Sequence, residues 1–348
     1  MNDFIGASRR RMQDAFEFRQ PDRIPLVYHG SPAGLYVHGQ KLIDLFNQYP
    51  PDNPITFDKL PVLGPEAFEP NGDYHQILTD EWGTAWEYRI YGITGHPKYY
   101  PFESWKQGLE SYRFPPLPAP GSPEFLEAQR RAAELHPHYF LFNGWVSIFE
   151  KLHALRPFDE LLMDLASENP DLLAFLDRIV EYWLQAIDYY AALGTDVFVF
   201  GDDWGMQKCP LIDPALFRKI YRPRYEKLFD RVKQHGGLIF LHCCGYMGEL
   251  LDEFLDMGIR GLWPQLNLYD RDDTFLQKCI DHRVAIYIHP DRQRLIPLGT
   301  PHEIDDYIHR MADRYHTIGG GAIFYVEIEN DAPFENVQAL VEAIDRYR

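Results

Sequence analysis

The sequence predicts an α/β fold, a single (β/α)8 barrel of the TIM type that spans residues 1–348 and carries an elaborated N-terminal insertion. From residue 122 onward, short apolar runs alternate with segments of helical pattern, as in a parallel sheet covered by helices on both faces. No glycine-rich phosphate turn follows the first apolar run, which disfavours an open, doubly wound sheet. A length of 348 residues also fits one barrel with insertions.

The first third of the chain is its irregular part. A short buried strand is expected over residues 23–30, where an apolar run ends at His29. Prolines then interrupt the chain repeatedly, and a small hairpin is expected around residues 79–86. We interpret residues 31–120 as an insertion in the barrel that is able to supply its eighth strand.

Strands and helices alternate regularly in the rest of the chain. Ser122 and Pro123 predict a helix start, because serine caps helix N-termini and proline fits the first turn. Another helix is expected from Asp213 to about Gln234. Further strands are expected at residues 139–143, 196–203, 238–245, 261–265, 285–290 and 322–327. Further helices are expected at residues 158–165, 170–192, 247–257, 274–282, from 300 onward and 334–347.

Composition excludes several classes of protein. Lys and Arg number 34 against 52 Asp and Glu, for a formal net charge of −18, so a nucleic-acid binder or a protein of anionic membrane surfaces is not expected. No apolar stretch is long enough to span a membrane, and the polar N-terminus is unlike a signal peptide. Four cysteines are too few for a disulfide scaffold, so we expect a cytoplasmic protein with free thiols. An aromatic content of 15% is consistent with a pocket walled by rings.

Each predicted strand changes from apolar residues to a polar residue or a thiol at its C-terminal end. In a barrel these ends meet at one mouth, where active sites lie. The start of a loop explains any single one of these residues equally well, but the set as a whole favours an active-site mouth. The strand-end residues are His29, Asn143, Asp202, Asp203, His242, Cys244, Gln265, His289 and Glu327.

The sequence His242-Cys243-Cys244-Gly245 is the sharpest local feature. Strand side chains alternate, so His242 and Cys244 are expected on one face and Cys243 on the other. An imidazole and a thiolate on one face can share a Zn²⁺ ion, although a catalytic zinc site needs a third protein ligand. Two small buried cysteines beside a hydrogen-bonded core histidine are the alternative interpretation.

Asp202 and Asp203 are candidate catalytic residues, together with His29. Neighbouring strand residues face opposite sides, so at most one of the two carboxylates faces a given pocket unless the strand has already ended. A carboxylate there could accept a proton or orient a ligand, whereas capping of a turn is the alternative. The candidate substrate-binding residues are Asn143, Trp204, Gln265, His289 and Arg292, of which the arginine suits a carboxylate or phosphate.

Several longer motifs occur in a fixed order along the chain. They are Arg19–Pro25, Thr79–Gly83, Gly201–Gly205, His242–Gly245, Arg292–Pro301 and Asp331–Asn336. Together they resemble the uroporphyrinogen decarboxylase superfamily over nearly the whole chain. The resemblance implies a single barrel with its site at the C-terminal mouth, in agreement with the strand pattern.

The resemblance is closer to the methyltransferase branch of this superfamily than to the true decarboxylases. Decarboxylases of this type use no cofactor and carry an early Arg-Gln-Ala-Gly-Arg-Tyr motif that holds substrate carboxylates. This chain has Arg19-Gln20-Pro21-Asp22-Arg23 near that place, without the motif. The other branch transfers methyl groups between corrinoids and thiols or methyl donors.

The resemblance also bears on the metal ligands. Zinc-dependent members of the methyltransferase branch use a His-x-Cys on a barrel strand and a later cysteine. His242 and Cys244 match the first two ligands, but no cysteine follows Cys279. Glu327 on the last strand is the first choice for the third ligand, and His289 is the second.

Three functions follow as hypotheses. The first is a methyltransferase with Zn²⁺ at the barrel mouth and a corrinoid, carried by a partner protein, as the other methyl carrier. The second is a metal-free decarboxylase of a porphyrinogen-like or other acidic substrate, with Asp202 or Asp203 and a cationic clamp such as Arg292. The third is a non-catalytic barrel that binds a small molecule. The sequence leaves open whether the chain is a monomer or a homodimer.

Overall fold

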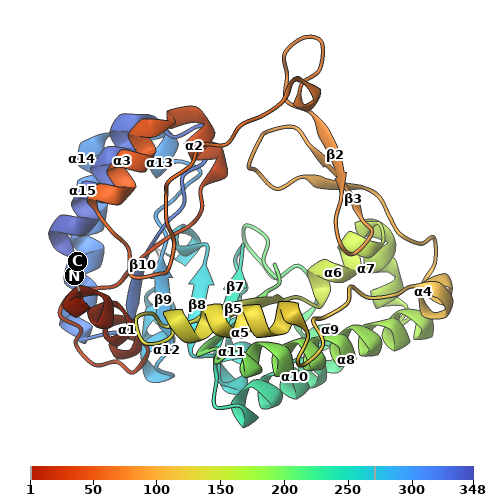
Figure 1. Ribbon diagram of the computed structural model, residues 1–348. Helices are drawn as coiled ribbons and strands as arrows, with labels where there is room; N and C mark the ends of the chain where they lie inside the picture. Colours follow the sequence, from red (N-terminus) through yellow and green to blue (C-terminus); the bar gives the residue numbers. More distant parts are fainter. Residues whose placement is uncertain (1, 270–271) are drawn as a thin grey trace.

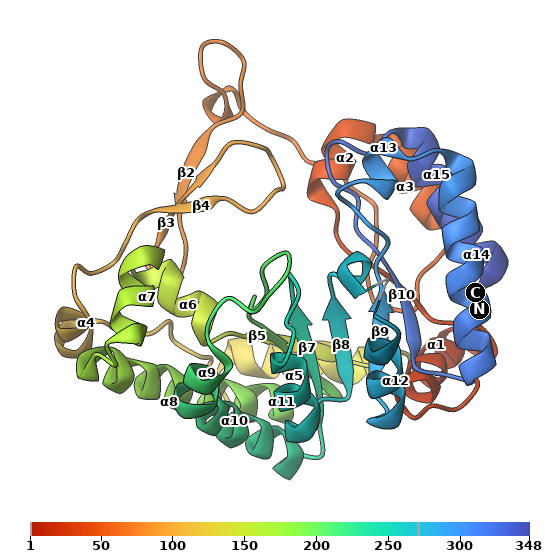
Figure 2. The same ribbon diagram turned by 180° about the vertical axis from the view of Figure 1, so that it is seen from behind.

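A curved parallel sheet of seven strands forms the centre of the molecule. The computed structural model describes residues 2–269 and 272–348, and in it the strand order is β1, β10, β9, β8, β7, β6, β5. Helices cover the outer side of the sheet, which confirms the predicted α/β alternation (Figures 1 and 2). The strands are β1 (Leu26–Tyr28), β5 (Phe142–Val146), β6 (Val197–Gly201), β7 (Leu238–Cys243), β8 (Gly261–Pro264), β9 (Ala285–Ile288) and β10 (Ala322–Val326).

The barrel is not closed by an eighth strand among the described residues. β1 and β5 are the edge strands of the sheet. The insertion instead forms a separate antiparallel sheet beyond the C-terminal ends of the barrel strands, from β2 (Gln76–Thr79), β3 (Ala85–Tyr88) and β4 (His96–Tyr99) (Figure 1). Short connections join these strands, in agreement with the predicted hairpin. They therefore pair with each other and not with β1 or β5. The carboxylate of Asp80 fixes the turn between β2 and β3 by accepting the backbone N–H groups of Trp82 and Thr84.

The helices lie between the strands, as the sequence predicts. Ser122 caps its helix through its hydroxyl, which accepts the N–H of Phe125. The helix expected over 213–234 is two helices, because Pro223 in the first turn of the second lacks the N–H that a continuous helix needs. The helices are α1 (Asn2–Phe16), α2 (Pro32–His38), α3 (Gln40–Gln48), α4 (Trp105–Ser111), α5 (Pro123–Leu135), α6 (Phe149–Leu155), α7 (Phe158–Ala166), α8 (Pro170–Ala192), α9 (Pro214–Ile220), α10 (Arg222–Gln234), α11 (Leu250–Met257), α12 (Asp273–Asp281), α13 (Leu295–Leu298), α14 (Pro301–Ile318) and α15 (Phe334–Tyr347).

Aromatic rings fill the lower part of the barrel. The ring of Phe16, at the end of α1, packs on Phe140 and Phe240 with centroid distances of 5.7 and 6.4 Å. Gly261 at the start of β8 makes this packing possible, because a Cβ there would lie 2.2 Å from Phe240 and 2.9 Å from Phe16. This aromatic cluster fills the N-terminal end of the barrel, below the C-terminal ends of the strands.

A buried ionic network joins the two ends of the chain. The carboxylate of Asp52 accepts hydrogen bonds from Ser8, Arg11 and the backbone N–H of Leu26. It also pairs with Arg348 at 3.1 Å, and both side chains are almost fully buried. The termini accordingly lie close together in Figures 1 and 2.

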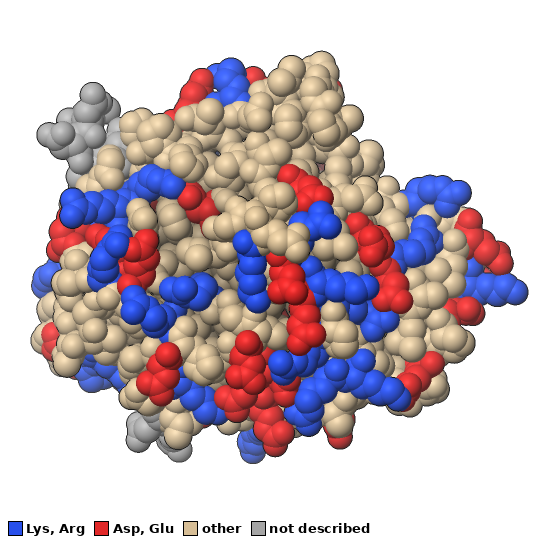
Figure 3. All heavy atoms as spheres, turned by 90° about the horizontal axis from the view of Figure 1, so that it is seen from below, with Lys and Arg blue, Asp and Glu red and all other residues tan. Residues whose placement is uncertain are grey.

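The face at the N-terminal ends of the strands carries acidic and basic side chains close to one another (Figure 3). The ion pair between Arg9 of α1 and Asp196, with an N–O distance of 2.7 Å, is an example from this end of the barrel. Of the helices that the structure describes, none is long and apolar enough to cross a membrane.

Candidate active site

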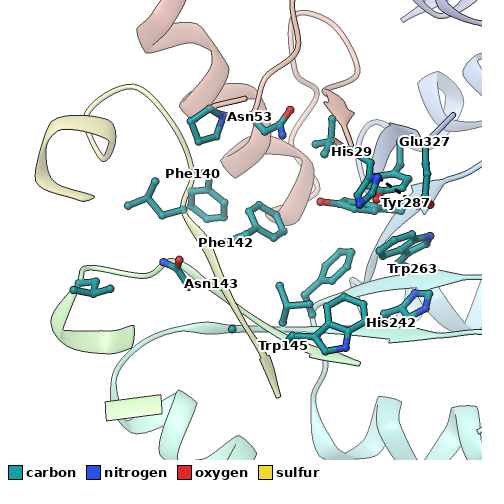
Figure 4. Close-up of a pocket in the computed structure, with 18 of the residues that line it drawn as sticks. His29, Asn53, Phe140, Phe142, Asn143, Trp145, His242, Trp263, Tyr287 and Glu327 are labelled. Carbon is teal, nitrogen blue, oxygen red and sulfur yellow. Dashed lines mark ion pairs between the residues drawn. The ribbon is translucent and has the colours of Figure 1, made fainter. Parts of the chain in front are cut away.

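A large cavity lies at the C-terminal ends of the barrel strands, with a volume of about 1240 Å³ (Figure 4). Residues from every strand of the parallel sheet, and from helices α5 and α6, line this mouth cavity. The structure thereby brings several predicted strand-end residues to one site, although they are far apart in sequence. The polar lining residues include His29, Asn143, Glu150, Asp203, His242, Cys244, Arg292 and Glu327.

Asp203, His242 and Cys244 form a compact group that could hold a metal ion. One ligand atom from each residue lies within 4.8 Å of the other two. The Nε2 atom of His242 lies 3.5 Å from the sulfur of Cys244 and 3.6 Å from Oδ1 of Asp203. The backbone N–H of Cys244 donates to Oδ1 of Asp203 at 2.6 Å, which fixes the carboxylate beside the strand.

This group differs from the ligand set that the sequence predicts. Glu327 and His289 were the expected partners of His242 and Cys244, but neither belongs to the group, whose third member is Asp203. Glu327 instead pairs with Arg292, and its carboxylate lies 3.3 Å from Nδ1 of His29. The sequence does not show this, because Asp203 lies just after the neighbouring strand, β6, and the pairing of β6 with β7 brings it beside His242.

Burial sets the protonation states of the two strand ligands. It lowers the pKa of His242 to about 4, so the imidazole is neutral at physiological pH and available as a ligand. It raises the pKa of Cys244 to about 12, and the charge of Asp203 acts in the same direction. Without a cation nearby the thiol is therefore protonated, and a metal ion would have to displace that proton.

Glu150 belongs to the same region of the cavity, although sequence reasoning did not single it out. It follows the first residue of α6 and lines the mouth cavity near Asp203. Burial and then the charge of Asp203 raise the pKa of Glu150 to about 8, so it holds a proton at neutral pH. The one signal in the sequence was its position shortly after the C-terminal end of a predicted strand.

Asp202 and Asp203 directly follow the end of β6, and of the two only Asp203 lines the mouth cavity. Its carboxylate is 1% exposed and accepts the backbone N–H groups of Ile148, Phe149 and Glu150. It also accepts the hydroxyls of Ser147 and Tyr225. Burial raises the pKa of Asp202 to about 6, although the hydrogen-bond donors act in the opposite direction. The carboxylate is therefore ionised at neutral pH and anchors the start of α6 away from the cavity.

Arg292 connects the last strand to the metal-ligating group. Its Nη1 atom lies 3.3 Å from Glu327 and 3.0 Å from Glu329, and its Nη2 atom lies 3.7 Å from the sulfur of Cys244. The guanidinium is thus ion-paired to two carboxylates and also faces the thiol. A thiolate at Cys244 would gain a charge-assisted contact there.

The other predicted substrate-binding residues have different positions. Asn143 lines the cavity and donates to the hydroxyl of Thr195. Gln265 accepts the backbone N–H of Gly245, and His289 is buried with its Nδ1 atom 3.2 Å from the indole nitrogen of Trp263. Trp204 is fully buried and stacks on Phe149, so it does not reach the cavity and supports the loop after β6.

Aromatic side chains form much of the cavity wall, and the sequence predicted them only through composition. Trp145 and Trp263 flank His242, with ring centroids at 5.4 and 4.2 Å (Figure 4). Trp145 rests on Gly201 at the end of β6, where a Cβ would lie 2.3 Å from the indole. The other rings in the wall are Phe140, Phe142, Phe240, Tyr287 and Tyr325.

Comparison with known proteins agrees with this architecture. The fold is similar to that of a methyltransferase from Methanosarcina mazei, with a TM-score of 0.60, 17% sequence identity and 98% of each chain covered. A 3-keto-D-glucoside 4-epimerase from E. coli gives a TM-score of 0.39 at 11% identity, over 64% of this chain and 86% of the epimerase. No curated protein matches the sequence. The profile of the uroporphyrinogen decarboxylase (URO-D) family matches residues 107–347, more than half of the chain. The chain therefore belongs to the uroporphyrinogen decarboxylase (URO-D) family.

Proposed function

We propose that this protein is a methyltransferase whose small substrate binds beside a Zn²⁺ ion held by Asp203, His242 and Cys244. The observation that carries the proposal is the convergence of these three ligand atoms, within 4.8 Å of one another, in the mouth cavity. One nitrogen, one sulfur and one oxygen ligand suit zinc, and three protein ligands leave a position for the substrate.

The surroundings of the three residues fit such an ion. The imidazole of His242 is neutral at physiological pH, and its Nε2 atom faces both other ligands. Bound Zn²⁺ would lower the pKa of a substrate thiol or polarise a methyl donor. Glu150, protonated at neutral pH beside Asp203, is placed to exchange a proton with a group that binds there.

A corrinoid on a partner protein is proposed as the other methyl carrier. The His-x-Cys motif supports it, because similar motifs occur in corrinoid-linked, zinc-dependent methyltransferases. The mouth cavity also extends from the metal-ligating group to Glu124 and Arg131 on α5, so the site opens to the molecular surface. A methyl group carried by a large cofactor on another protein needs such an open approach.

The cavity supports a decarboxylase of a polycarboxylate less well. Substrates with several carboxylates need free cations, as the arginines of decarboxylases in this family illustrate. Among the described residues that line the cavity, the two arginines are already paired, Arg131 with Glu127 and Arg292 with Glu327 and Glu329. A substrate would therefore have to displace carboxylates of the protein.

The test is a methyl-transfer assay with free methylcobalamin as the donor and a panel of small thiols as acceptors. The absorbance of the demethylated corrinoid measures the transfer. We expect transfer by the wild-type protein, loss of transfer in Cys244→Ser, and retention in the Cys243→Ala control, whose sulfur faces away from the cavity. Release of CO₂ from an acidic substrate without any metal would overturn the proposal. Stabilisation by ligands without turnover would point to the binding barrel.

A further inference from the structure

We propose that the small substrate carries a substituted ammonium group, which the aromatic wall of the mouth cavity holds as a cation. This inference rests on the proposed function in one respect, that the molecule bound in the mouth cavity is the substrate. It comes from the aromatic side chains that line the barrel interior and from the charges around them.

The interior of this barrel is unusually aromatic. Barrel interiors are generally filled by Val, Ile and Leu, whereas seven aromatic residues line this cavity. They form a continuous wall: Trp263 lies 4.3 Å from Tyr325 and 6.0 Å from Tyr287, and Tyr287 lies 4.5 Å from Phe240, between ring centroids. Tyr287, Tyr325 and Phe240 are buried against one another, so Trp145 and Trp263 are the rings of this wall that are most open to a cation.

The wall is open to a ligand where it adjoins the metal-ligating group. Trp145 is 42% exposed although it lies at the end of a barrel strand, and Trp263 is only partly buried. These two indoles flank His242 and lie 6.4 Å from each other at a steep angle of 77°. Neighbouring aromatic rings at the edge of a cavity are the kind of site that recognises a substituted ammonium group.

The charges in the cavity also favour a cation. Among the described lining residues there are two arginines, no lysine and five acidic side chains, of which Glu150 holds a proton at neutral pH and the other four are carboxylates. A divalent metal ion would be balanced by the Asp203 carboxylate and the Cys244 thiolate. Arg292 is the one guanidinium beside two carboxylates, Glu327 and Glu329, so acidic groups outnumber arginines on that side as well.

The same features disfavour other substrates. An anion would meet this negative field and would find each arginine already paired. A neutral substrate would gain contact with the rings but nothing from the field. A substituted ammonium gains from both, and because its alkyl groups shield the charge, it loses little hydration when it enters an apolar wall.

The experiment compares three small probes of nearly equal shape: choline, neutral 3,3-dimethylbutan-1-ol and anionic 3,3-dimethylbutanoate. Their binding to the full-length protein is measured by calorimetry, and the zinc content of each sample is determined alongside. We expect choline to bind tenfold or more tightly than the neutral probe, and the anion to bind most weakly. Trp145→Leu should reduce choline affinity about tenfold and change binding of the neutral probe much less. Tyr99→Leu, at an exposed ring on β4, is the matched control and should change neither.

Equal binding of choline and the neutral probe, preference for the anion, or no binding of any probe to folded protein would overturn the inference. Stoichiometric zinc with no preference for choline would defeat this inference alone. Preference for choline in a protein that holds no zinc would defeat the proposed metal site alone.

Discussion

The stability of the folded protein should depend on pH through the carboxyl group of Glu150. Burial and Asp203 raise its pKa to about 8 from an ordinary 4.5, so the folded protein binds this proton more tightly than the unfolded chain. The resulting stability is fully present below about pH 4.5 and is lost as the pH rises toward 8. The proton on Glu150 thus stabilises the folded, metal-free protein at acidic pH.

We therefore predict that Glu150→Gln, which is neutral at every pH, becomes more stable relative to the wild type as the pH rises from 5 to 8. At about 1.4 kcal/mol per pKa unit, the difference should amount to a few kcal/mol. Urea unfolding of both proteins, after any bound metal has been removed with a chelator, measures the difference. The contribution of Asp202 to the pH dependence is present in both proteins and cancels in the comparison. A difference in stability that is the same at pH 5 and pH 8 would contradict the assigned role.

At the scale of an element, Asp202 fixes the start of α6 and Asp203 serves the cavity. Three consecutive backbone N–H groups of residues 148–150 point at the Asp202 carboxylate. Helix N-termini leave such groups unpaired, and a buried carboxylate is a strong acceptor for them. One strand end therefore holds a structural and a candidate functional carboxylate next to each other.

This division predicts opposite results for two neighbouring variants. Asp202→Ala should lower the free energy of unfolding by about 3 kcal/mol or more, because several buried donors lose their acceptor. Asp203→Ala, at a side chain that is 38% exposed, should cost much less stability. Chemical denaturation of both proteins in metal-free buffer measures the contrast. Equal losses of stability would show that Asp202 is not the anchor of α6.

Particular elements show how far the sequence was informative. Apolar runs located the barrel strands, and the cap at Ser122 located the start of α5, because both signals are local. The eighth strand was wrongly expected, because pairing within the insertion is decided by its hairpins and not by the barrel. The third residue of the metal-ligating group and the position of Glu150 depend on which strands and helices are neighbours, and a single sequence does not specify that.

At the scale of the whole molecule, Asp52 joins α1, β1 and the C-terminal residue. Its partners Arg11 and Arg348 are almost fully buried, and although Arg11 also pairs with Asp22 and Arg348 with Asp345, Asp52 is the carboxylate that contacts both. Removal of Asp52 would leave two buried guanidinium groups with one carboxylate fewer each, in a medium that solvates charge poorly. The network therefore ties the first helix of the barrel to the last.

Asp52→Ala should accordingly lower the free energy of unfolding by about 3–5 kcal/mol. The control is Asp252→Ala, which removes an exposed ion pair with Lys278 and should cost less than about 1 kcal/mol. Thermal and urea unfolding of the two variants and the wild type make the comparison. A loss at Asp52 no larger than the loss at Asp252 would show that the ends of the chain are held by packing alone.

The measurement that tests the central claim most directly is the zinc content of purified protein and its variants, determined by mass spectrometry after dialysis. We predict one zinc per chain in the wild type, loss of zinc with an intact fold in His242→Ala, Cys244→Ser and Asp203→Asn, and retention in Cys243→Ala and Glu327→Gln. Retention of zinc in Asp203→Asn with loss in Glu327→Gln would restore Glu327 as the third ligand. A wild-type protein that is folded and active without bound metal would contradict the account.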